Sequence, residues 1–176
     1  MIFATVGTQL PFDRLLIGLD GWAAKNPGIP IIAQTGATKH RFRYIETVSH
    51  LSQSAFHNHF AAARLVVGHA GMGTILSAAE LGKPLILMPR RAKFGEHRND
   101  HQQDTLREMS RLSNITVAED GEALHLALDK ALACGFVVTG TESPSQPDTL
   151  SPLIDEIRDF VWEGCCPSPR AASRIG

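Results

Sequence analysis

Residues 65–103 read LVVGHAGMGTILSAAELGKPLILMPRRAKFGEHRNDHQQ, and this stretch decides the fold. An apolar, β-branched run at 65–67 predicts a buried strand, and the pattern at 74–81 predicts a helix. A second buried strand is predicted over 85–88, where Pro89 ends it. A strand, a helix and a second strand in this order indicate a parallel sheet covered by helices.

A glycine-rich turn joins the first strand to the helix. The helix N-terminus after this turn offers unpaired amides and positive potential, which favour phosphate. The competing interpretation is that Gly71 and Gly73 only permit a tight turn. The loop residue His69 stands directly before the turn and can donate to a phosphate oxygen, which favours binding over a purely structural role. We expect Thr74 both to cap the helix and to donate to phosphate.

Amide and imidazole side chains follow the second strand in a polar loop. They are Asn99, His101, Gln102 and Gln103, and a helix is predicted over 100–111. Because the carboxyl ends of parallel strands meet at one edge of a sheet, these side chains can reach the same crevice as the glycine turn. For either glutamine alone, a surface position is the competing interpretation. The whole block predicts one site for a phosphorylated, hydroxyl-rich ligand.

The rest of the chain alternates predicted strands and helices. Further strands are predicted over 2–6, 30–34, 43–48 and 115–117, and further helices over 11–25, 53–63 and 121–133. The repeated units predict an α/β fold, a single Rossmann-like domain with a parallel sheet over residues 1–138. We expect a linker at 139–151, an amphipathic helix at 152–163 and a disordered tail at 164–176.

Composition narrows the function class. A net charge of −1 gives no long-range attraction to nucleic acid or to anionic lipid. No apolar run approaches the roughly 20 residues that span a bilayer, and the first residues lack the basic flank of a signal peptide. The 3 cysteines show neither metal-ligand spacing nor a disulfide framework. We therefore expect a cytoplasmic protein.

Two common nucleotide-binding motifs are missing from the sequence. Leu76 occupies the position of the third glycine of the dinucleotide fingerprint, and the turn lies in the middle of the chain. The turn also lacks the lysine of a P-loop. We expect no bound cofactor.

The central block resembles a known family. Residues 69–74, HAGMGT, together with 82–84, GKP, a strand ended by proline, and 99–103, NDHQQ, resemble the donor-binding half of GT-B glycosyltransferases, specifically the C-terminal domain of glycosyltransferase family 28. Residues 5–13, TVGTQLPFD, are similar to the start of its single-domain type. That type includes the catalytic subunits of the UDP-N-acetylglucosamine transferase of lipid-linked oligosaccharide synthesis and of an exopolysaccharide glucuronosyltransferase. The resemblance covers about residues 1–135.

The resemblance implies roles for particular residues. Gly7, Thr8 and the 71–74 turn, including Met72, would face the diphosphate, and Gln102 and Gln103 would face the donor sugar.

One position departs from the family pattern. Ser77 stands where the wider family usually has a ribose-binding glutamate. Glu80 lies about one helical turn further along. Either Ser77 makes a shorter contact with the ribose or Glu80 replaces the glutamate.

The resemblance also implies an activity. It is the metal-independent, inverting transfer of a hexose from a UDP-sugar to a polyprenyl-diphosphate-linked saccharide, in exopolysaccharide or glycan synthesis. No metal ion is expected because the sequence has no Asp-x-Asp motif. The departing UDP would be stabilised by the helix N-terminus and His69.

We expect a partner to complete the site. The reaction cleft of this enzyme class needs two Rossmann-like halves, and 176 residues supply one. A membrane-anchored, acceptor-binding subunit would supply the other half and the general base. The chain would thus lie at the inner face of the cell membrane, and self-association is left open. An apolar stripe in the 152–163 helix either docks on this partner or packs on its own domain.

The donor sugar and the function class each have alternatives. Arg90, Arg91 and Lys93 favour glucuronate, with N-acetylglucosamine next, because arginine binds carboxylates in a bidentate manner. The competing interpretation places these cations in solvent or against the partner. The alternatives to a transferase are a non-catalytic nucleotide-sugar-binding regulatory module and a UDP-sugar epimerase or hydrolase.

Overall fold

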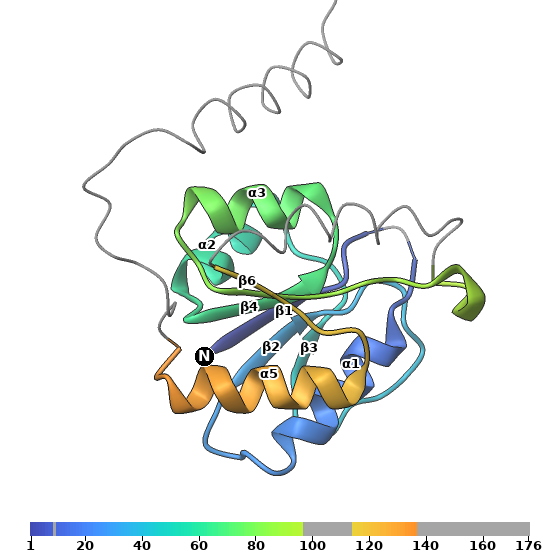
Figure 1. Cartoon of the computed structure of the whole chain (residues 1–176). Helices are drawn as coiled ribbons and strands as arrows, with labels where there is room; N and C mark the ends of the chain where they lie inside the picture. The colour runs from blue at the N-terminus through green and yellow to red at the C-terminus, as the bar shows by residue number, and fades with distance from the viewer. Residues whose placement is uncertain (9, 97–113, 137–176) are drawn as a thin grey trace, which may run out of the picture. The chain divides into compact units, whose positions relative to one another are not determined.

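The computed structural model describes residues 1–8, 10–96 and 114–136 (Figure 1). The predicted helix over 100–111, the linker, the C-terminal helix and the tail lie outside these residues.

The described residues form a parallel six-stranded sheet with the order β3-β2-β1-β4-β5-β6. Its strands are β1 Ile2–Thr5, β2 Ile31–Gln34, β3 Glu46–Val48, β4 Leu65–His69, β5 Leu85–Met88 and β6 Ile115–Val117. Every neighbouring pair is parallel. The chain winds outward from β1 to β3, then crosses back to β4 and winds outward on the other side. The predicted Rossmann-like α/β fold is therefore confirmed.

Helices cover both faces of the sheet (Figure 1). On one face lie α1 and α5, and on the other lie α2 and α3. Their bounds are α1 Asp13–Ala23, α2 Gln53–Ala62, α3 Met72–Glu80 and α5 Gly121–Ala133, and a short 3₁₀ turn, η1, covers Ala92–Phe94. Between α1 and α5, the indole Nε1 of Trp22 donates to Asp129 Oδ1 at 2.7 Å.

The strands are apolar on both faces because helices cover both. In β1, Ile2 and Ala4 belong to the core cluster beneath α1 and α5, whereas Phe3 belongs to the cluster beneath α2 and α3. All three are fully buried. Burying a large apolar side chain contributes about 1.5–3 kcal/mol, so these two layers hold the sheet rigidly beneath its loops.

Two boundaries in the central block differ from the prediction. Strand β4 continues beyond the apolar run to His69, because His69 pairs with Met88 of β5. Helix α3 begins at Met72 instead of at 74, with Gly71 as its N-cap and no side-chain capping bond. The predicted capping role of Thr74 is therefore wrong: Thr74 lies inside the first turn, where its amide donates to the Gly71 carbonyl at 3.1 Å.

Candidate functional site

A cavity of about 1130 Å³ opens at the carboxyl edge of the sheet. It lies beyond the carboxyl ends of the neighbouring strands β1 and β4, which are followed by helices on opposite faces of the sheet (Figure 1). Ligands bind at this position in open α/β sheets. Its lining comes from β1 and its loop (Thr5, Val6, Gly7, Thr8, Leu10), β2 (Gln34), α2 and the loop before it (Leu51, Gln53, Ser54, Phe56, His57, Asn58), β4 and α3 (His69, Gly73, Thr74, Ser77, Glu80), and the β5 loop (Arg90, Glu96).

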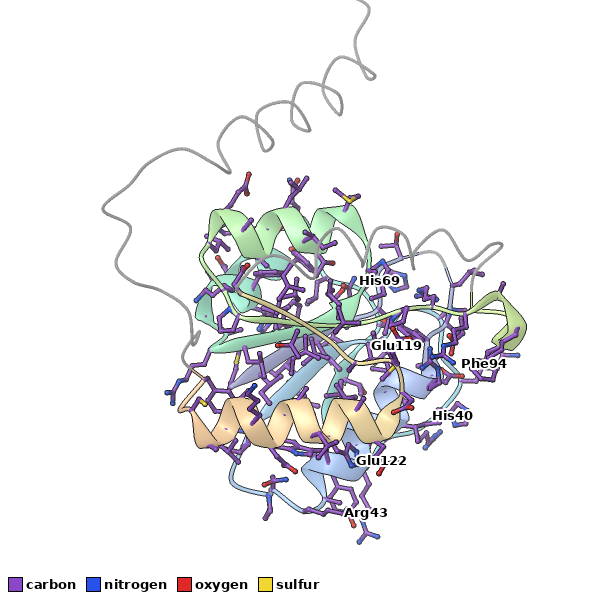
Figure 2. All side chains as sticks on the ribbon, in the orientation of Figure 1. His40, Arg43, His69, Phe94, Glu119 and Glu122 are labelled. Carbon is purple, nitrogen blue, oxygen red and sulfur yellow. The ribbon has the colours of Figure 1, made fainter. Side chains whose placement is uncertain are left out.

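His69, labelled in Figure 2, stands at the carboxyl end of β4. Its imidazole ring packs between two glycines, Gly7 and Gly71. A Cβ atom on Gly7 would lie 2.7 Å from His69 Cε1, and one on Gly71 would lie 2.9 Å from the same atom. Gly7 also has a φ of +73°, in the left-handed region that favours glycine. The two glycines therefore make room for the imidazole, and the sequence-predicted trio of Gly7, His69 and Gly71 is brought together.

The N-terminus of α3 presents two backbone amides. Gly71 N donates to the His69 carbonyl at 2.8 Å, and the amides of Thr74 and Ile75 both donate to the Gly71 carbonyl. Within the described residues, the amides of Met72 and Gly73 make no hydrogen bond. With the helix dipole behind them, these amides favour an anion.

One face of α3 forms a wall of the cavity. Thr74, Ser77 and Glu80 follow one another at intervals of three residues, so they lie on the same side of the helix. Both candidates for a ribose contact, Ser77 and Glu80, therefore line the cavity.

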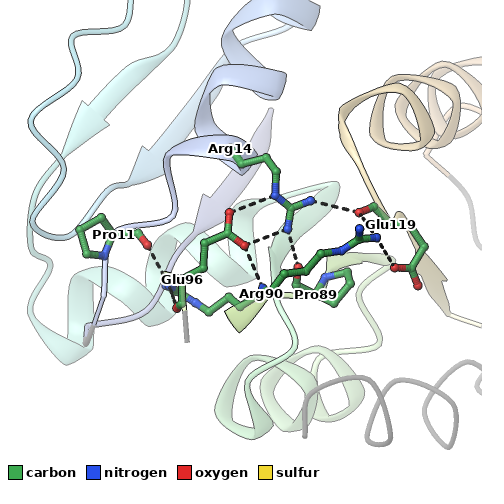
Figure 3. A network of polar contacts seen from close by, with 7 residues as sticks. Pro11, Arg14, Pro89, Arg90, Glu96 and Glu119 are labelled. Carbon is green, nitrogen blue, oxygen red and sulfur yellow. Dashed lines mark hydrogen bonds and ion pairs between the residues drawn. The ribbon is translucent and has the colours of Figure 1, made fainter. Parts of the chain in front are cut away.

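Arg90 holds a loop in place (Figure 3). Its Nη1 donates to the carbonyls of Pro11 and Glu96, both at 2.9 Å, and its Nη2 to those of Val6 at 2.6 Å and Leu10 at 2.7 Å. Burial lowers the pKa of this guanidinium, and Glu96 acts in the opposite direction. Arg90 lines the cavity, and four of its N–H groups donate to backbone carbonyls. These bonds give Arg90 a structural role, and the predicted contact with a sugar carboxylate stays a prediction.

A second arginine extends this network (Figure 3). Arg14 donates from Nε and Nη2 to the two carboxylate oxygens of Glu96, both at 3.0 Å, and also to the carbonyls of Pro89 and Glu119. Arg91 pairs with the Glu119 carboxylate at 3.0 Å. The network ties together the loops that follow β1, β5 and β6, so the cavity rim has a fixed shape.

Some predicted residues stay untested and some lining residues were missed. Asn99, His101, Gln102 and Gln103 lie outside the described residues. Sequence reasoning treated 53–63 only as a covering helix, although the start of α2 supplies a wall of the cavity, and it overlooked the cavity residues Thr5 and Gln34. Polar residues at the ends of two buried strands were the available signal.

Two absences hold for the described residues only. Residues 1–8, 10–96 and 114–136 contain no group of three or more His, Cys, Asp or Glu side chains that could hold a metal ion. Within the same ranges, no helix is both long and apolar enough to cross a bilayer.

The chain is similar to known proteins in sequence and in fold. A transferase of Porphyromonas gingivalis is 31% identical over 170 residues; it is UDP-N-acetylglucosamine–N-acetylmuramyl-(pentapeptide) pyrophosphoryl-undecaprenol N-acetylglucosamine transferase. The match covers 89% of this chain and 38% of that protein, so the chain spans less than half of its relative.

Solved structures share the fold. MurG of Acinetobacter baumannii superposes with a TM-score of 0.59 at 17% identity, over 89% of this chain and 49% of that chain. ALG13 superposes with a TM-score of 0.58 at 17% identity, over 87% of this chain and 94% of that chain. The sequence profile of the glycosyltransferase family 28 C-terminal domain matches residues 1–133. The chain is thus a member of the glycosyltransferase family 28 C-terminal domain family.

Proposed function

We propose that this chain binds the UDP-sugar donor of a glycosyltransferase and presents it for transfer with inversion at the anomeric carbon. The observation that carries the proposal is the cavity at the β1–β4 crevice, bordered by the open N-terminus of α3 and by His69. Family membership supports a transferase, and the cavity volume of about 1130 Å³ leaves room for a nucleotide sugar.

The proposed chemistry stabilises a leaving group. The acceptor oxygen attacks the anomeric carbon, the bond from that carbon to the diphosphate oxygen breaks, and negative charge develops on the diphosphate. The amides of Met72 and Gly73, the helix dipole and the His69 imidazole would stabilise that charge. We propose that no divalent metal is needed for this step.

With the diphosphate at the N-terminus of α3, the positions of the ribose and the sugar follow. The ribose would contact the α3 wall at Ser77 or Glu80. By resemblance, the sugar would face Gln102 and Gln103. UDP would therefore lie across the carboxyl edge, with its sugar directed toward the open side, where an acceptor can approach.

For the donor sugar we propose N-acetylglucosamine. The sequence argument for glucuronate rested on Arg90, Arg91 and Lys93. Of these, Arg90 donates to four carbonyls, Arg91 pairs with Glu119, and Lys93 is exposed. The printed name of the Porphyromonas gingivalis relative specifies UDP-N-acetylglucosamine as its donor. Glucuronate is the alternative, and competition between the two UDP-sugars for the purified chain decides between them.

We propose that the acceptor is a lipid-linked saccharide and that a membrane-anchored subunit binds it and supplies the general base. This would place the chain at the inner face of the cell membrane through its partner. Transfer that appears only when the two chains are mixed supports this arrangement, whereas robust turnover by this chain alone contradicts it. Truncation after Asp148 tests the C-terminal helix: lost partner binding with UDP binding kept indicates docking, and global unfolding indicates packing.

One experiment separates the transferase from the other function classes. The chain is incubated with UDP-N-acetylglucosamine, the partner and a lipid-linked acceptor, and products are identified by mass spectrometry. A glycosylated acceptor with released UDP supports transfer. Free sugar or an isomerised UDP-sugar indicates a hydrolase or an epimerase, and binding without any product indicates a regulatory module.

A further inference from the structure

Two polar side chains occupy positions on the sheet that face an apolar core. Thr5 and Gln34 are register partners at the ends of β1 and β2, and they are 1% and 5% exposed. Two residues earlier, Phe3 belongs to the core cluster beneath α2 and α3, and Ile32, which is partly buried, packs against that cluster. Side chains two apart on a strand point to the same face, so the apolar face becomes polar just where the cavity begins.

A chain of hydrogen bonds determines which way the Gln34 carboxamide points. The Gly7 amide donates to Thr5 Oγ1 at 3.2 Å, and Thr5 Oγ1 donates to Gln34 Oε1 at 2.8 Å. The buried Thr5 hydroxyl has one proton, and Gln34 Oε1 is the acceptor for it. Because Oε1 faces Thr5, the Nε2 group of Gln34 points away from Thr5. This group makes no hydrogen bond to the described residues.

Gln34 lines the cavity, and its Nε2 atom is not among the fully buried side-chain atoms, so the group is open to the cavity and available to a ligand. We propose that Gln34 is a ligand-binding residue whose Nε2 group donates to an acceptor oxygen of bound UDP. Thr5 is a positioning residue: it orients the carboxamide and, through the Gly7 amide, holds the loop beside His69. The inference rests on the proposed donor-binding function and adds a contact on the cavity floor that this function does not by itself assign.

Three variants separate the ligand contact from a purely structural role. Gln34→Glu keeps an oxygen for the Thr5 hydroxyl and replaces the donating NH₂ with an acceptor when the carboxyl group is ionised. It is measured at both about pH 7 and about pH 9, because burial raises the pKa of a carboxyl group, and the result at the higher pH is the one interpreted. Gln34→Met removes both polar atoms at similar length. Thr5→Val removes only the hydroxyl that joins Gly7 to Gln34. Each is titrated with UDP and with uridine by calorimetry, and its unfolding midpoint is recorded without ligand.

We expect Gln34→Glu to weaken UDP binding about tenfold or more, because a donor is lost and an anion faces the ligand. Gln34→Met should weaken it more than Thr5→Val does. A larger loss for UDP than for uridine places the acceptor oxygen on the phosphates, and equal losses place it on the nucleoside.

The contrary results are equally specific. Wild-type UDP affinity in folded Gln34→Glu overturns the inference, because the retained oxygen then suffices. Should Gln34→Glu not fold, equal affinities of Gln34→Met and Thr5→Val overturn it, since both variants break the same Thr5–Gln34 bond. A wild-type chain that binds no UDP overturns the proposed function together with this inference, and that outcome is distinct from the others.

Discussion

The imidazole ring of His69 fills the space that a side chain on Gly71 would need. A Cβ atom there would lie 2.9 Å from His69 Cε1, closer than packed carbon atoms approach. Gly71 is also the N-cap of α3, so the residue that starts the helix is the residue that admits the histidine. Gly71 thus both caps the helix and leaves space for the imidazole. Its φ is −95°, a value that other residues adopt readily. The requirement for glycine is therefore one of space.

Gly71→Ala should displace the imidazole and weaken UDP binding about tenfold, with a loss of stability of about 1–3 kcal/mol from overpacking. Gly121→Ala is the matched control, because Gly121 also starts a helix and a Cβ there meets nothing within 4 Å. Calorimetric titration and urea denaturation measure both effects. Equal UDP affinities for the two variants would contradict the tight packing at Gly71.

His69→Ala should weaken UDP binding by about 1–3 kcal/mol if the imidazole donates to a phosphate oxygen. The loss should be smaller for uridine, which lacks the phosphates. The exposed His50 is the control position, since it lies outside the cavity lining. A folded His69→Ala protein with unchanged UDP affinity would return His69 to a structural role.

Mutagenesis can decide which of the two α3 residues, Ser77 or Glu80, contacts the ribose. We expect Glu80→Gln to weaken UDP binding about fivefold and to have no effect on UDP that lacks both ribose hydroxyls, because a carboxylate accepts from those hydroxyls more strongly than an amide does. Ser77→Ala should have a smaller effect. The reverse ranking, measured with the same two ligands, would assign the ribose contact to Ser77.

Arg90→Met should destabilise the protein by about 3 kcal/mol, because several carbonyls lose a charged donor at once. Lys93→Met, an exposed change in the same loop, should have little effect. Urea denaturation gives the free energy of unfolding of each. The ratio of affinities for UDP-glucuronate and UDP-N-acetylglucosamine should be unchanged in Arg90→Met; selective loss of UDP-glucuronate binding would restore Arg90 as a sugar-binding residue.

Local patterns predicted most of the described secondary structure. Helix α5 was predicted with its observed bounds because its leucines, among them Leu124 and Leu128, repeat at helical spacing. The structure adds the N-cap Asp120, whose side chain accepts from the Ala123 amide. The predicted start of α3 was wrong because the sequence alone does not distinguish the roles of Gly71 and Gly73. Only the backbone geometry shows that the first is the cap and the second is helical.

Site contacts between residues that are close in the sequence could be predicted. Contacts between residues from distant segments could not. His69 and the glycine turn stand together in the sequence, and the structure keeps them together. The role of Arg90 depends on a carbonyl of Val6, 84 residues away, and no local pattern indicates such a contact. Gln34 carried a usable signal, since a polar residue ending a buried strand calls for an explanation.

The central claim is that this chain binds UDP by itself at the β1–β4 crevice. Calorimetric titration of UDP into the purified chain in EDTA tests it most directly, with thermal unfolding as a second measurement. We predict one UDP bound per chain, affinity unaffected by EDTA, and stabilisation of about 2.7 kcal/mol at 100 times the dissociation constant. Binding that is lost in EDTA and restored by manganese would contradict the metal-independent step. A folded chain that shows neither binding heat nor stabilisation at millimolar UDP would contradict the central claim itself.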